Sequence, residues 1–194
     1  KYQDERMADK AFDLAWTPGQ LLLRQLNVTD ADAQRYCQLA GSIVYANPVL
    51  RADAATLIRN SKGQSGLWGY AISGDLPIVL LKVADPSRLS LVNQMIQAHT
   101  YWRQKGLRVD LMIWNEDQTG YRQELHDQIV GLAGAALEDV NMEQPGGIFI
   151  RTQERISDED RVLIQTVARV IPPASAGMLD EQWRRLLKSD LVPT

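Results

Sequence analysis

Three predominantly apolar runs constrain the fold of this chain more than any other feature. They cover residues 77–83 (PIVLLKV), 107–114 (LRVDLMIW) and 146–151 (GGIFIR). Each has the length of a strand and lacks the alternation of apolar and polar residues that marks a half-exposed strand. Continuous apolar strands are typical of a sheet that is covered on both faces. The sequence therefore predicts a buried, mostly parallel sheet.

Segments with helical periodicity separate these runs. Residues 87–105 and 121–137 each carry an apolar face, and Gly106 is expected to cap the first of them. A third helix is expected to begin at Ser157, with Asp160 completing a capping box. The predicted inward faces are Leu91, Val92, Met95, Ala98 and Trp102; Leu125, Ile129, Leu132 and Ala136; and Val162, Leu163 and Val167. The order predicts an α/β fold: a three- to four-stranded, mostly parallel sheet flanked by helices, with 168–173 (ARVIPP) as the fourth strand.

Helical extensions are predicted at both ends. Residues 29–46 read as a helix with a capping box at Thr29 and Asp32, and 52–59 as a shorter one. The apolar face of the first is expected to hold Ala33, Tyr36, Cys37, Ala40 and Val44, with Cys37 as a buried thiol. Residues 4–16 and 178–190 also have helical periodicity. We divide the chain into an N-terminal helical segment (1–62), an α/β core (63–173) and a C-terminal helix and tail (174–194).

The glycine-rich segment 63–83 (GQSGLWGYAISGDLPIVLLKV) raises the question of a phosphate site. A phosphate cradle follows a strand and opens a helix, whereas these glycines precede a strand. We favour an irregular loop that needs positive φ and close backbone approach. A sugar platform formed by Trp68 and Tyr70 is the alternative. Asp75 is expected to accept backbone N–H groups and to hold the loop in place.

Few other residues suggest chemistry. Asn115 and Glu116 follow the second strand, where open α/β sheets bind ligands, although a helix-capping loop is the favoured explanation. His99 and His126 have no third partner at metal-ligand spacing. We predict no catalytic residue, metal site or cofactor. A net charge of −3 disfavours nucleic acid as a partner, and no apolar run reaches the roughly 18 residues of a membrane helix.

Five blocks of the chain resemble cyclic β-1,2-glucan synthases in the same order. They are AFDLAWT, LNVTDADAQ, GQSGLWGYAISGDLPIVLL, AHTYWRQKGLRVDLMIWNE and GGIFIRT, and SGLWGYAISGDLPIVLL is the most specific part. The resemblance implies a domain excised from a large bacterial inner-membrane protein, positioned at its cytoplasmic face. That protein combines a glucosyltransferase that uses UDP-glucose with phosphorylase-like, glucan-processing modules.

What the resemblance implies for this chain is limited. The matching blocks carry no transferase motif, and the chain is too short for the helical barrel of a phosphorylase, so no catalytic residue is carried over. We expect a scaffold whose partners are other domains of the same protein, with the terminal helices (Trp16, Trp183) packed together or forming an exposed apolar patch. One alternative is a β-1,2-glucan-binding module that uses Trp68, Tyr70, Asp75, Asn115 and Glu116. A small independent transferase or hydrolase is the other.

Overall fold

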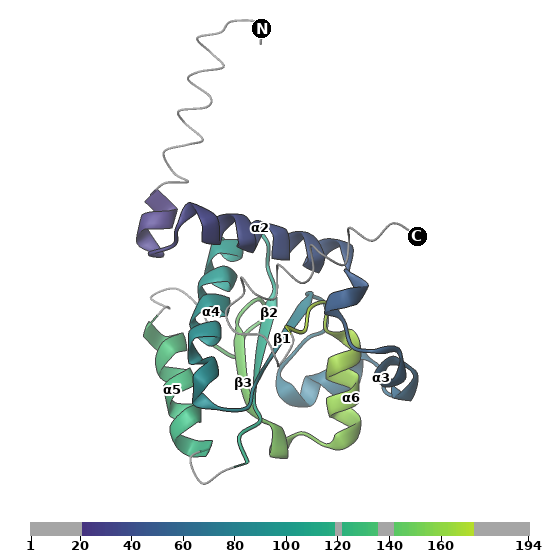
Figure 1. Cartoon of the computed structure of the whole chain (residues 1–194). Helices are drawn as coiled ribbons and strands as arrows, with labels where there is room; N and C mark the ends of the chain where they lie inside the picture. Colours follow the sequence, from purple (N-terminus) through teal and green to yellow (C-terminus); the bar gives the residue numbers. More distant parts are fainter. Residues whose placement is uncertain (1–20, 119–121, 136–141, 173–194) are drawn as a thin grey trace, which may run out of the picture.

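A three-stranded parallel sheet forms the centre of the described part of the chain. The computed structural model describes residues 21–118, 122–135 and 142–172. Strands β1 (Ile78–Val83), β2 (Asp110–Asn115) and β3 (Ile148–Thr152) lie in the order β1-β2-β3 (Figure 1). Their register pairs Leu80 with Met112 and Met112 with Phe149. The predicted α/β class and the three predicted strands are confirmed.

Helices cover both faces of this sheet. One face carries α4 (Leu89–Gln104) and α5 (Arg122–Ala135), and α2 (Asp30–Tyr45) packs against α4 and joins the same core. The other carries α6 (Asp158–Val167) and the 3-10 helix η2 (Gln64–Tyr70), as Figure 1 shows for α6. The remaining helical elements are α3 (Ala54–Arg59) and the 3-10 turns η1 (Pro48–Leu50), η3 (Pro86–Arg88) and η4 (Gln153–Arg155), and residues 21–25 are helical as well.

The alternation of side chains along β1 builds two separate cores. Val79 and Leu81 pack under α2, α4 and α5, whereas Leu80 packs under η2 and α6. All three side chains are fully buried. The absence of a polar residue from most positions of the strands follows from this double coverage, because each residue faces one core or the other.

The predicted fourth strand is reduced to one bridge. Val170 pairs in parallel with Val79, and the Leu80 N–H donates to the Val170 carbonyl oxygen at 2.9 Å. The Arg169 N–H donates to the Ile78 carbonyl oxygen at 2.8 Å. Pro172 lacks the N–H that an extended ladder would need, which limits pairing beyond this point.

The capping box of α2 is confirmed, and so is the predicted burial of Ala33 and Tyr36, but the rest of the buried face differs from the prediction. Asp32 N–H donates to Thr29 Oγ1 at 3.1 Å, and Thr29 N–H donates to Asp32 Oδ2 at 3.2 Å. Cys37 and Val44 are exposed, so the prediction of a buried thiol is wrong. Each lies one residue, about 100° of helix, beyond a buried position. The buried residues are Ala33, Tyr36, Leu39, Ser42 and Ile43.

Other predicted features of the helices agree with the structure or fall outside it. Gly106 follows α4 with φ +85°, the left-handed conformation expected after a helix. Leu125 and Ile129 of α5 are buried. The terminal helices, with Trp16 and Trp183, lie outside the described residues. The domain boundaries stay a prediction.

Candidate functional site

The glycine-rich segment begins with a helix where we predicted an irregular loop, whereas residues 71–77 form neither helix nor strand. Residues Gln64–Tyr70 make η2, whose Leu67 is buried against α6. A Cβ on Gly66 would lie 2.6 Å from Leu163 Cδ2 of α6. Gly74 has φ +79°, and a Cβ there would lie 2.7 Å from Gln64 Cγ. The expected close approach and positive φ are therefore present, and they serve packing.

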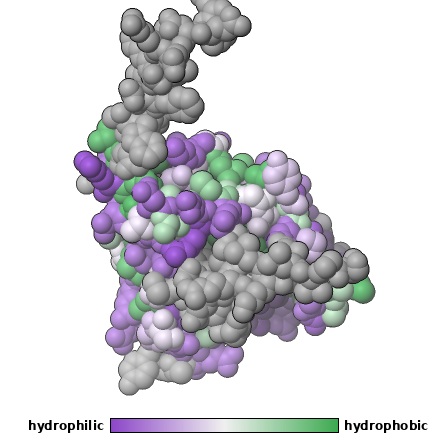
Figure 2. All heavy atoms as spheres, turned by 45° about the horizontal axis from the view of Figure 1, so that its top comes forward, coloured by the Kyte–Doolittle hydropathy of each residue, from purple (hydrophilic) through white to green (hydrophobic). Residues whose placement is uncertain are grey.

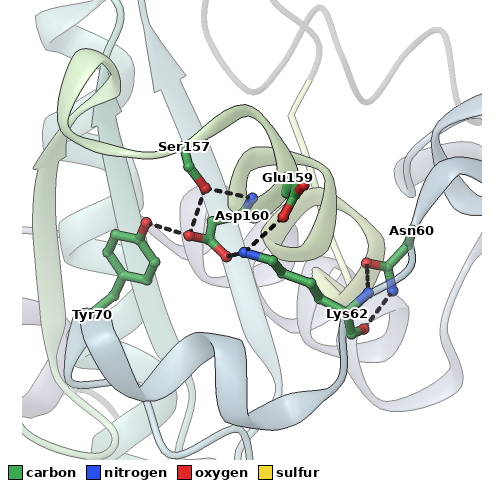
Figure 3. A network of polar contacts seen from close by, with 6 residues as sticks. All are labelled: Asn60, Lys62, Tyr70, Ser157, Glu159 and Asp160. Atoms are coloured by element: carbon green, nitrogen blue, oxygen red, sulfur yellow. Dashed lines mark hydrogen bonds and ion pairs between the residues drawn. The ribbon is translucent and has the colours of Figure 1, made fainter.

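A polar network around Asp160 fastens this segment to the first turn of α6 (Figure 3). Lys62 Nζ lies 2.8 Å from Asp160 Oδ1 and 3.2 Å from Glu159 Oε2. Tyr70 Oη donates to Asp160 Oδ2 at 2.9 Å, and Ser157 Oγ donates to the same oxygen at 2.7 Å. The hydrogen bond from Lys62 lowers the pKa of the Asp160 carboxyl. Burial, followed by the hydrogen bond to Asp160, raises the pKa of Tyr70.

This network alters the interpretation of two predicted residues. The half-buried Tyr70 is held by Asp160, and its carbonyl oxygen accepts a hydrogen bond from Arg151 Nη2 at 2.8 Å. Trp68 is 65% exposed, and its indole N–H reaches the Ser73 carbonyl oxygen at 3.4 Å. The two aromatic residues are therefore engaged by different partners, which leaves Trp68 as the ring with an open face.

Asp75 does not have the expected role in the loop. The residue is exposed, and its carboxylate oxygen Oδ1 accepts a hydrogen bond from the side-chain amide of Gln64 at 3.1 Å. Its own backbone N–H donates to Ser73 Oγ at 3.2 Å. The hydroxyl of Ser73 thus holds the turn, as serine commonly does two residues before the bonded N–H. The carboxylate of Asp75 is left facing solvent and Gln64.

A pocket of about 460 Å3 lies beside Asp75, at the amino end of β1. Gln64, Asp75 and Arg169 contribute polar side chains to it. Asn60 and Lys62 are further polar residues of the lining, and the remaining lining residues are Ile43, Val44, Gly63, Leu67, Gly74, Leu76, Pro77, Ile78, Leu163 and Val167. Gln64 and Arg169 were not among the predicted site residues, because their separation along the chain gives no sign that they meet.

The polar residues at the carboxyl end of β2 have a structural role. Asn115 is fully buried, its Nδ2 donates to the Arg122 carbonyl oxygen at 3.0 Å, and its Oδ1 accepts the Asp117 N–H at 3.0 Å. The half-buried Glu116 donates its backbone N–H to the Val83 carbonyl oxygen at 2.7 Å. Asn115 ends its strand whereas Asp75 precedes one, so parallel strands put them at opposite edges of the sheet. The predicted ligand-binding residues therefore do not form one site.

Two titratable side chains are buried near the start of β2. A ring nitrogen of His99, Nε2, lies 2.9 Å from the Val109 carbonyl oxygen, and burial lowers the pKa of this histidine. Asp110 Oδ1 accepts the Gly146 N–H at 2.6 Å, and burial raises the pKa of Asp110. Within the described ranges, no three His, Cys, Asp or Glu residues gather in a way that could hold a metal ion.

Comparison with known proteins gives one informative match. No family model matches the chain. It is 29% identical over 172 residues to the cyclic β-(1,2)-glucan synthase NdvB of Rhizobium meliloti (strain 1021). The match covers 88% of this chain but 6% of that relative. In the part of the chain that the structure describes, no helix has the length and apolar character to cross a membrane. The chain is therefore similar to one domain-sized segment of a cyclic β-(1,2)-glucan synthase, as its sequence blocks indicated.

Proposed function

We propose that this chain is a non-catalytic domain of a cyclic β-1,2-glucan synthase and that it docks against neighbouring domains of the same protein. The observation that carries the proposal is the domain-sized match to NdvB over almost the whole chain. The hydrogen bonds made by two of the polar side chains support a structural role. Asn115 and Asp160, which stand at the carboxyl edge of the sheet and in the first turn of α6, are both used in hydrogen bonds within the chain.

An exposed apolar surface supports the docking part of the proposal. Tyr45 at the end of α2 and Ile58 on α3 are 87% and 84% exposed, and Val44 and Val49 are more than half exposed. We call these four residues the α2–α3 surface. Figure 2 turns the α2 side toward the viewer and shows apolar residues interspersed with polar ones there. Val44, Tyr45 and Val49 lie within six residues of one another along the chain, and exposed apolar patches are commonly sites of protein contact.

The proposal is tested in a chimaera in which this chain replaces the matching segment of the Rhizobium meliloti synthase. The double substitution Tyr45→Ser and Ile58→Ser should lower cyclic glucan formation from UDP-glucose by about tenfold or more, because each loses apolar contact at an interface. Arg59→Ser, the exposed neighbour of Ile58 on α3, is the matched control and should leave synthesis unchanged. Thermal unfolding of the isolated variants checks that the domain itself still folds.

Two results would contradict the proposal. Unchanged glucan synthesis by the double variant would show that the α2–α3 surface is not an interface with a neighbouring domain. Glucose transfer from UDP-glucose, or phosphorolysis of β-1,2-glucan, by the isolated chain would show that the domain is catalytic. A glucan-binding role is the second candidate, and the pocket beside Asp75 favours it.

A further inference from the structure

The pocket at the amino end of β1 has the size and lining of a small-molecule site. Its volume of about 460 Å3 falls within the roughly 300–1,000 Å3 that such sites occupy. It is built by the end of α2, the start of η2, the segment before β1 and the inner side of α6. Leu76, Pro77 and Val167 give it apolar walls, and Gln64, Asp75 and Arg169 supply polar groups.

The polar groups of the pocket are positioned and available. Gln64 Nε2 donates both to the Ser73 carbonyl oxygen at 2.8 Å and to Asp75 Oδ1 at 3.1 Å, which holds the carboxylate in place. The Asp75 carboxylate keeps a second oxygen that can accept hydrogen bonds. Arg169 is exposed, and among the described residues its guanidinium has no ion-pair partner.

The charge balance of the pocket favours a neutral ligand. Lys62 also lines it, but Asp160 and Glu159 already pair with its ammonium group. The charges left for a ligand are one carboxylate and one guanidinium. An anion would be attracted by the Arg169 guanidinium but repelled by the Asp75 carboxylate. A polyhydroxylated ligand can donate hydroxyl hydrogen bonds to the carboxylate and accept them from the guanidinium.

Trp68 adds an aromatic surface next to this pocket. Its indole N–H donates to the Ser73 carbonyl oxygen, which is the acceptor that Gln64 also uses. With 65% of its surface exposed, the ring offers an apolar face beside the polar groups. An aromatic body with its polar end fixed suits the mixed apolar and polar surface of a sugar ring.

We propose that this pocket binds a neutral glucan, with Asp75 and Arg169 hydrogen-bonding sugar hydroxyls and Trp68 packing on an adjacent ring. The choice of β-1,2-linked glucose rests on the proposed function. The site would hold the product of the synthase on its non-catalytic domain. It lies at the amino edge of the sheet, opposite the carboxyl edge where open α/β sheets usually bind ligands.

Titration of the isolated 194-residue chain with a linear β-1,2-glucan tetrasaccharide tests the site. Calorimetry should give saturable binding, and the indole N–H signal that disappears in Trp68→Phe should shift during an NMR titration. Asp75→Ala and Arg169→Met should each weaken binding at least tenfold. Arg155→Met, at another exposed arginine, is the matched control and should leave the affinity unchanged. Circular dichroism checks that all variants fold.

Three outcomes would overturn the inference. They are an absence of saturable glucan binding, glucan affinity that survives both Asp75→Ala and Arg169→Met, and binding of inorganic phosphate in preference to glucan. None of them affects the chimaera experiment, which measures synthesis through the α2–α3 surface. Failure of the glucan site and failure of the proposed function are therefore separate results.

Discussion

Two buried titratable side chains, His99 and Asp110, make the stability of this protein depend on pH in opposite directions. Burial lowers the pKa of His99, so its contribution to stability is present above its usual value of 6.5 and is lost as the pH falls below it. Burial raises the pKa of Asp110, so its contribution is present below the usual value of 3.8 and is lost as the pH rises. Neither direction could be read from the sequence, because both follow from desolvation in the fold.

Asp110→Asn isolates the second effect. The free energy of unfolding of the wild type minus that of the variant should be greatest near pH 4 and should fall toward pH 7, since only the wild type must bury a charge. The fall should be about 1.4 kcal/mol for each unit by which the pKa of Asp110 is raised. Urea unfolding at several pH values measures it. A difference that does not vary with pH would show that Asp110 is not held in a desolvating environment.

Local residue patterns predicted some single-residue roles and missed others. The Thr29 and Asp32 cap follows from four consecutive residues and is present. The burial of Cys37 was predicted from the same helix and is wrong. A helix cap is formed by residues of a single turn, so it can be predicted locally. Burial of a side chain instead depends on which side of α2 packs against α4. The role of Asp75 was also mispredicted, because its hydrogen-bond partners are Gln64 and Ser73 and not the backbone N–H groups that we expected.

The helix η2 shows how glycine permits two elements to pack closely. A Cβ at Gly66 would come within 2.6 Å of Leu163 Cδ2, but a Cβ at Gly69 would meet nothing within 4 Å. The two glycines belong to the same short helix. Substituting each of them in turn therefore distinguishes the effect of close packing from the effect of helix propensity. The glycine-rich motif is explained by contact with α6 and by the turn at Gly74.

Gly66→Ala is expected to lower the free energy of unfolding by about 1–3 kcal/mol, the usual cost of overpacking a core. Gly69→Ala should change it by no more than about 0.5 kcal/mol, as is typical of surface substitutions. Chemical denaturation of both variants provides the comparison. Equal effects at the two positions would mean that contact with Leu163 is not what requires glycine at position 66.

At the scale of the whole molecule, α2 joins the same core as the sheet. Ile43 is 1% exposed in that core, and Trp102 Nε1 of α4 donates to the Tyr36 carbonyl oxygen at 2.7 Å. The neighbouring Val44 is 55% exposed. The boundary that we predict at residue 62 would separate α2 from helices with which it shares buried surface.

Ile43→Ala should lower the free energy of unfolding by about 2–5 kcal/mol, and Val44→Ala should change it by no more than about 0.5 kcal/mol. Because one sheet carries both cores, the slowest-exchanging amides of β1 and α6 should exchange faster by the same factor in Ile43→Ala. Hydrogen exchange measures this directly. Faster exchange confined to α2 would instead support residues 1–62 as a separate unit.

The sequence by itself determined the three strands, the helices between them and the class of the fold. Continuous apolar runs can be buried on both sides only in a covered sheet, so β1, β2 and β3 and the helices between them could be predicted from local patterns. The tertiary structure alone decided which polar groups meet. Gln64 and Asp75 lie in the glycine-rich segment and Arg169 lies far along the chain, and they share a pocket because Val170 returns to pair beside β1. The pairing of Val170 with β1 depends on packing between distant parts of the chain, so it cannot be predicted from the local spacing of apolar residues.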